Sequence, residues 1–142
     1  MRPKSLVLAG FILLLIANIA YSADFSIQPP PQSMDKFYSE PGKTSEWIEQ
    51  MRQISKSFGA TIISRDKKKW EKALKHAKKF GLAYKKASEM VPEWKDLFDL
   101  EASELFVASI QSQDTEKIKS FSEKVKKTCS QCHRKHNISV WT

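Results

Sequence analysis

From residue 44 onwards, apolar side chains recur every three or four positions, which is the spacing of one face of an α-helix. No stretch shows the alternating pattern of a half-buried strand, so the sequence predicts an all-α fold. The pattern divides into four blocks. They begin at Thr44 or Ser45, at about Asp66, near Pro92, and at Asp114 or Thr115, with the second block ending at Met90.

Each block carries an apolar face that we expect to point into a shared core. The predicted inward residues are Trp47, Ile48, Met51, Ile54, Phe58 and Ile62 in the first block, and Trp70, Leu74, Ala77, Phe80, Tyr84 and Ala87 in the second. The third contributes Trp94, Leu97, Phe98, Ala102, Leu105 and Phe106, and the fourth contributes Ile118, Phe121, Val125, Cys129 and Cys132. The blocks are about 18–25 residues long, or roughly 27–37 Å of helix. Because the joints between them are short, neighbouring helices should run antiparallel. The sequence therefore predicts an antiparallel up-down-up-down four-helix bundle over residues 44–142.

The segment before the first block has a different character. Residues 23–43 contain three successive prolines, Pro29 to Pro31, and later Pro41-Gly42. Proline removes a backbone donor and fixes φ, so a continuous helix is excluded here. We expect an extended, Pro-rich N-terminal lead-in.

Residues 1–22 have the organisation of a secretory signal peptide. Arg2 and Lys4 precede an apolar run from Leu6 to Ala17, and small residues surround an expected cleavage point after Ser22. The alternative is an uncleaved membrane anchor, but the run is shorter than the ~20 residues of a spanning helix. No other stretch is long and apolar enough to span. We therefore expect a periplasmic protein without a membrane span after cleavage.

The charge is strongly basic. The chain has 24 basic and 16 acidic side chains, and removing the signal segment leaves 22 basic against the same 16. Nine lysines lie between Lys67 and Lys86, in the second block. One interpretation is a docking surface for an acidic redox partner, and the other is an ordinary solvated helix face. Export excludes nucleic acid as a partner.

The only two cysteines belong to one short motif near the end of the fourth block. Cys129 and Cys132 follow Val125 at helical spacing, so both sulfurs should face the interior, and His133 comes next. Cys-x-x-Cys-His is the attachment signature of c-type haem, in which two thioethers hold the ring and the imidazole binds iron. We expect one covalent haem c per chain, bound by these three residues, with His133 as an iron ligand.

Two other uses of the cysteines stay open. Cys129 and Cys132 could form a disulfide or a thiol redox pair in an oxidising compartment, although the βαβ context of thioredoxin-like motifs is absent. In that event the protein would be a haem-free helical interaction module. A zinc site would need four ligands, which Cys129, Cys132, His136 and His76 could supply.

The signal segment, the four helical blocks and the motif Cys129-Ser130-Gln131-Cys132-His133 together resemble the class II cytochromes c. That family comprises cytochrome c prime and its low-spin, methionine-ligated relatives, and the resemblance covers about residues 44–137. The family commonly has an aromatic and then a basic residue three and four positions after the ligating histidine. His136 and Asn137 occupy those positions here, so the basic group is missing unless Arg134 or Lys135 replaces it. Members often dimerise through their first two helices, so the resemblance also implies a homodimer as one oligomeric state.

The resemblance makes the sixth iron ligand the deciding feature. Aligning Phe58-Gly59 with a similar pair in some members puts Met51 at the distal position, where the low-spin relatives carry a methionine. His/Met ligation raises the reduction potential and favours one-electron transfer. If Met51 only fills the core, the position is vacant and the protein binds gases such as nitric oxide or carbon monoxide. His76 and Met90 are weaker candidates, and His136 is expected to contact a propionate or solvent.

The chain contains no Gly-rich phosphate loop and no nucleophile elbow, and its acidic residues scatter over predicted outer faces. We therefore expect an electron carrier and not an enzyme. Trp141 near the C-terminus is an unusual ending, for which a partner surface and a chain that continues in other contexts both stay open.

Overall fold

The computed structural model describes residues 28–38, 42 and 44–136. The expected signal peptide at 1–22, part of the lead-in at 23–43, Asn137 and Trp141 lie outside the described residues. In the described part every regular element is a helix, which confirms the all-α prediction. The elements are η1 (Gln32–Phe37), α2 (Glu46–Asp66), α3 (Trp70–Met90), η2 (Pro92–Leu97), α4 (Leu100–Gln111) and α5 (Thr115–His136). None of the described helices has the length and apolar character needed to cross a membrane.

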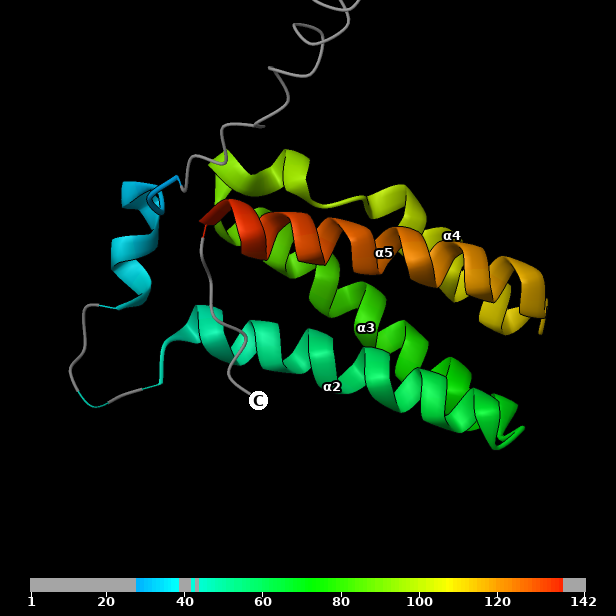
Figure 1. The fold of residues 1–142 in the computed structure, drawn as a ribbon. Helices are drawn as coiled ribbons and strands as arrows, with labels where there is room; N and C mark the ends of the chain where they lie inside the picture. The colour runs from blue at the N-terminus through cyan, green and yellow to red at the C-terminus, as the bar shows by residue number, and fades with distance from the viewer. Residues whose placement is uncertain (1–27, 39–41, 43, 137–142) are drawn as a thin grey trace, which may run out of the picture.

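The four α-helices pack in order along the chain. α2 packs along α3, α3 along α4, and α4 along α5, whereas α2 and α5 do not form a comparable pair. In Figure 1, α3 is visible between these two outer helices. The first and last helices are therefore each held from one side by a neighbour and are not sealed against each other.

Side-chain capping accounts for the start of α5 but not for the start of α2. Asp114 accepts a hydrogen bond from the backbone N–H of Lys117 at 3.0 Å, which caps α5 as predicted. Ser45 is the N-cap of α2, but its side chain makes no cap hydrogen bond. Its Oγ is instead buried without a partner. This helix start therefore depends on packing more than on capping.

The third predicted helix begins later than expected. Pro92 starts the 3-10 helix η2 and not a long α-helix, and Phe98 is extended, with φ −102° and ψ 115°. Asp99 then caps α4 by accepting from the backbone N–H of Ala102 at 2.8 Å. Proline does fit a first helical turn, and Pro92 opens η2, but the cap at Asp99 starts a new helix only after η2 has ended. Leu97 and Phe98 consequently come from a connection and not from a helix face.

The lead-in is not extended throughout. Gln32–Phe37 forms the 3-10 helix η1, which buries Met34 at 4% exposure. Ser33 donates from its Oγ to a carboxylate oxygen of Glu93 at 2.7 Å. The backbone N–H of Gln28 donates to the carbonyl of Lys135 at 2.9 Å. Prolines before η1 prevent a long helix, yet the buried Met34, the packing of Phe37 against Trp47 and these two bonds attach the segment to the helical domain.

Aromatic side chains form the centre of the core. The ring of Phe80 lies 5.3 Å from that of Phe58, 5.6 Å from that of Phe106 and 5.4 Å from that of Tyr84. Two predicted inward residues are wrong, since Ile48 and Leu105 are each 38% exposed. Both lie on the edges of their helical stripes, where 3.6-residue periodicity does not separate a buried from an exposed position.

Two helical glycines predict unequal responses to an added methyl group. A Cβ on Gly59 in α2 would meet nothing within 4 Å, whereas on Gly81 in α3 it would lie 3.3 Å from Cγ2 of Val107. Because alanine restricts the unfolded chain and favours helix, Gly59→Ala should stabilise the protein by roughly 0.5–1 kcal/mol. Gly81→Ala should gain less, since Val107 must shift. Urea unfolding of both variants measures the difference, and an equal gain would contradict it.

Candidate functional site

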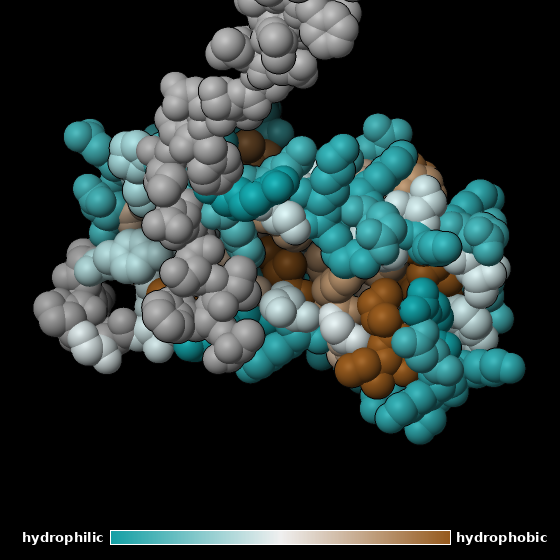
Figure 2. All heavy atoms as spheres, in the orientation of Figure 1, coloured by the Kyte–Doolittle hydropathy of each residue, from teal (hydrophilic) through white to brown (hydrophobic). Residues whose placement is uncertain are grey.

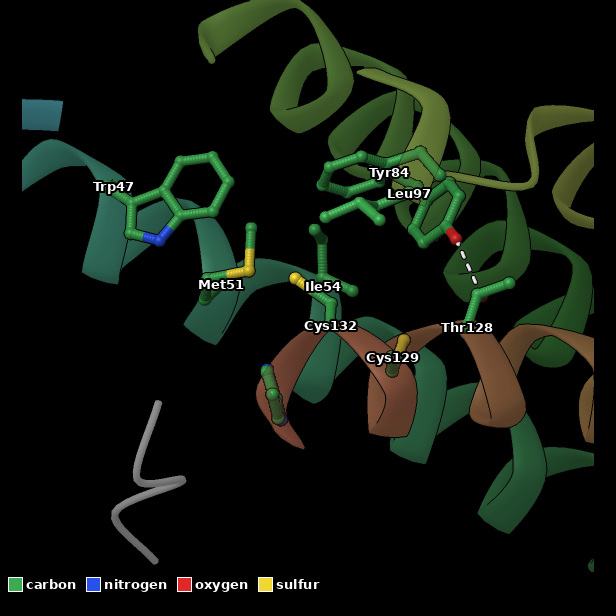
Figure 3. A pocket seen from close by; sticks show the side chains of 10 residues that line it. Trp47, Met51, Ile54, Tyr84, Leu97, Thr128, Cys129 and Cys132 are labelled. Atoms are coloured by element: carbon green, nitrogen blue, oxygen red, sulfur yellow. Dashed lines mark hydrogen bonds between the residues drawn. The ribbon is translucent and has the colours of Figure 1, made fainter. Parts of the chain in front are cut away.

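A pocket with a mostly apolar wall lies where α2, α3, η2 and α5 come together (Figure 3). Ten residues line it: Trp47, Met51 and Ile54 from α2, Tyr84 from α3, Leu97 and Phe98 at the end of η2, and Thr128, Cys129, Cys132 and His133 from α5. The pocket thus occupies the side of the domain where α2 and α5 are not packed against each other. In Figure 2, brown apolar side chains are visible in the middle of this face, between hydrophilic ones.

The pocket brings together all four residues that the sequence predicted for the site. Cys129, Cys132 and His133 lie in the last turns of α5 and are half-buried, and Met51 approaches from α2. Figure 3 shows both cysteine side chains pointing into the pocket, with the sulfur of Cys132 directed towards the sulfur of Met51. The helical register explains this arrangement, because Val125 one turn earlier is 2% exposed and fixes which face of α5 is inward.

Burial sets the protonation of the motif. It raises the pKa of the Cys129 thiol. Burial, together with the neighbouring Cys129, raises the pKa of Cys132 to about 11. Burial also lowers the pKa of His133, because a desolvated imidazolium is disfavoured. At neutral pH the pocket therefore holds two free, protonated thiols and an imidazole whose neutral form, the form that binds metals, is favoured.

A hydroxyl pair closes the pocket beside Cys129. The hydroxyl oxygens of Tyr84 and Thr128 are 3.1 Å apart (Figure 3). Because Thr128 Oγ1 donates to the carbonyl of Val125 at 2.8 Å, the Tyr84 hydroxyl is the donor between them. Burial raises the pKa of Tyr84 to about 12. This bond joins α3 to α5 and ties the motif-bearing helix to the core.

Sequence reasoning named several of these wall residues only as core and missed Thr128 altogether. Tyr84, Trp47 and Ile54 were predicted to be inward, but periodicity does not distinguish a pocket wall from a packed interior. Thr128 could have been found, because it directly precedes Cys129 on the same helix. Its role depends on Tyr84 being opposite, and that is a tertiary contact.

The weaker candidate ligands, His76, Met90 and His136, do not line the pocket. His76 is half-buried on α3, and Met90 is partly buried against the core at the end of that helix. His136 is only 7% exposed, which argues against solvent as its contact, whereas the alternative contact with a propionate stays a prediction. Its ring centre is 4.6 Å from that of Trp94. Its Nδ1 is 3.2 Å from the carbonyl oxygen of Gln28, and its Nε2 is buried without a partner.

These positions bear on the zinc alternative. Within the described residues, which include all four proposed zinc ligands, no group of three or more His, Cys, Asp or Glu side chains could hold a metal ion. The donor set that is assembled contains two thiols, one imidazole and one thioether in apolar surroundings.

The side chains that line the pocket have the donor groups that a covalently attached haem needs, but the pocket is too small to hold the ring as it stands. The thiols of Cys129 and Cys132 and the imidazole of His133 line the same apolar space on α5. The thioether of Met51 approaches this space from α2. The space itself measures only about 40 Å³, whereas ligand pockets generally measure roughly 300–1,000 Å³. A ring would therefore enter from the open side and increase the separation of α2 and α5. That movement breaks no close helix pair, because each helix is held by another neighbour.

Comparisons of the chain with models of protein families, with curated proteins and with solved structures gave no match.

The buried Tyr84 hydroxyl predicts a specific loss of stability at high pH. A folded pKa of about 12 exceeds the usual value of 10.0. The phenol therefore costs nothing below pH 10, and ionisation favours the unfolded chain increasingly as the pH rises towards 12. The expected loss is roughly 2 kcal/mol. Urea unfolding of wild type and Tyr84→Phe at neutral pH and across this range measures it, since the variant cannot ionise there. Parallel losses in both proteins would contradict the assignment.

Proposed function

We propose that this protein is an exported, periplasmic c-type cytochrome that carries one haem and transfers single electrons. The observation that carries this proposal is that one apolar pocket is lined by Cys129, Cys132 and His133 from α5 and by Met51 from α2. The two helices are not packed closely against each other. The resemblance of the Cys-x-x-Cys-His motif to that of class II cytochromes c supports the same assignment.

In this proposal each residue of the site has a defined role. The thiols of Cys129 and Cys132 would hold the ring through thioether bonds to its two vinyl groups. The neutral imidazole of His133 binds the iron. When bound, the haem supplies an iron centre that alternates between ferric and ferrous states.

Met51 is the proposed sixth ligand. Its sulfur faces the pocket from the helix opposite the cysteines (Figure 3), and a thioether suits low-spin iron of raised potential. The aromatic and aliphatic wall keeps water from the site and favours the less charged, reduced state. The protein therefore acts as an electron carrier and not as an enzyme.

The up-down-up-down antiparallel order of the four helices is part of the proposal. Contacts between α2 and α3 support it for that pair. Glu46 at the start of α2 pairs with Lys86 near the end of α3 at 3.4 Å, and the Gln50 side chain donates to the carbonyl of Ala83 at 2.8 Å. Further along α2, Phe58 contacts Phe80. The short connection from the end of α4 at Gln111 to the start of α5 at Thr115 favours the same alternation for that pair.

The attachment test uses the full chain expressed with its own N-terminal segment in a bacterium that matures c-type cytochromes. Intact mass of the exported protein should equal the mature chain plus one haem. Cys129→Ala and Cys132→Ala should each lose a thioether and most of the product, because a singly attached ring is less well retained. Unmodified or mutually bridged cysteines in the wild-type protein would overturn the proposal.

The ligand test uses absorption spectra of the oxidised and reduced protein with and without carbon monoxide. We expect low-spin bands that carbon monoxide does not change in the wild type, and a high-spin, carbon monoxide-sensitive spectrum in Met51→Ala. Met90→Ala is the matched control, since Met90 is also partly buried but does not line the pocket, and its spectrum should match the wild type. A wild-type protein that binds carbon monoxide would instead indicate the gas-binding function.

A further inference from the structure

A second concave surface lies between α3 and α4 and shares no residue with the pocket. It is an open groove of about 420 Å³, lined by Lys78, Gly81, Leu82 and Lys85 from α3 and by Leu100, Ser103, Glu104 and Val107 from α4. We call this surface the α3/α4 groove. The proposed haem site does not use it, although Lys78 and Lys85 belong to the lysine run that the sequence offered as a docking surface.

Apolar residues contribute to the lining of the α3/α4 groove, and one of them is strongly exposed. Leu82 is 72% exposed, the largest exposed fraction among the large apolar residues that the structure describes. Gly81 beside it has no side chain, so that part of the floor is backbone next to Val107. An isolated exposed leucine is common on protein surfaces, but one located in a groove offers a place for a partner's side chain to be buried.

The rim of the groove on the α3 side carries unbalanced positive charge. α3 has six lysines and two glutamates. Among those lysines only Lys86 lies within 4.0 Å of a carboxylate in the described part of the chain, where it pairs with Glu46. Lys78 and Lys85 are therefore available to an outside anion on either side of Leu82. Glu104 is the one acidic residue that lines the groove.

We propose that the α3/α4 groove binds an acidic protein partner that inserts an apolar side chain beside Leu82. The charge selects this occupant, because carboxylates placed next to Lys78 and Lys85 gain attraction that no residue of the chain now provides. A second copy of this chain would bring two net-positive α3 helices together, with only Glu104 in each groove to offset them. A concave surface with an apolar floor also suits a protruding side chain or a helix better than a flat lipid surface.

Partner binding at this surface leaves the pocket unobstructed. The groove uses the side of α3 that faces α4, whereas Tyr84 of the same helix lines the pocket. The inference does not require haem, so its test is separable from the attachment test.

The test titrates a synthetic helical peptide, with glutamates flanking one phenylalanine, into isotopically labelled mature protein followed by NMR. We expect shifts concentrated at Gly81, Leu82 and Val107 and an affinity that falls as salt rises. Leu82→Glu should weaken binding at least about tenfold, since it removes apolar burial and adds repulsion. The matched control is Ile63→Glu on α2, because Ile63 is 57% exposed and lies outside the groove. It should lower the affinity far less, through net charge alone.

Charge variants separate the occupants. Lys78→Glu and Lys85→Glu should each weaken the peptide severalfold, and Glu104→Lys should strengthen it. Sedimentation of the same samples tests for a second copy, and flotation with anionic phosphatidylglycerol vesicles tests for lipid. Self-association that Glu104→Lys weakens, vesicle binding without peptide binding, or equal effects of Leu82→Glu and Ile63→Glu would overturn the proposal. Haem content from absorbance, measured alongside, shows whether the cytochrome assignment survives independently.

Discussion

The site depends on one feature of the packing: α2 and α5 are not packed closely against each other. Each of these helices is fixed by its other neighbour, so apolar side chains such as Met51, Ile54 and Cys132 line a space that the chain itself does not fill. Burial of apolar surface contributes roughly 25 cal/mol per Å², so an apolar group inserted here would stabilise the domain. An apolar group placed here would complete the packing between α2 and α5, and the proposed haem would do so once the two helices move apart.

The end of α5 is held by contacts from three other parts of the chain. Thr128 accepts from Tyr84 of α3, and His136 stacks on Trp94 of η2. The lead-in contributes Gln28, whose backbone N–H and C=O both bond to the last residues of α5. These contacts fix the rotation of α5 and therefore the direction in which Cys129 and Cys132 point. The lead-in is consequently part of the site's support, although it does not line the pocket.

Much of the fold followed from periodicity, and the failures have identifiable causes. The stripes through Phe80, Phe106 and Val125 were assigned correctly because each lies at the centre of its apolar face. Ile48 and Leu105 lie on the edges of theirs, where only the neighbouring helix determines exposure. At Pro92 two signals competed, and the cap at Asp99 divided one predicted helix into a 3-10 helix and a shorter α-helix. That division is what allows Leu97 and Phe98 to reach the pocket.

The amino-acid sequence by itself determined the helical class, the end of α3 at Met90 and the start of α5 after Asp114. It also determined that the two thiols and the imidazole lie on one helix. It could do so because spacing, capping and motif chemistry are local properties of the chain. Only the tertiary structure decided that Met51 lies opposite Cys132, that Tyr84 meets Thr128, and that His136 is buried. Each of those contacts joins residues at least 40 positions apart or encloses one among several elements, so the way the helices pack determines them and no local pattern does.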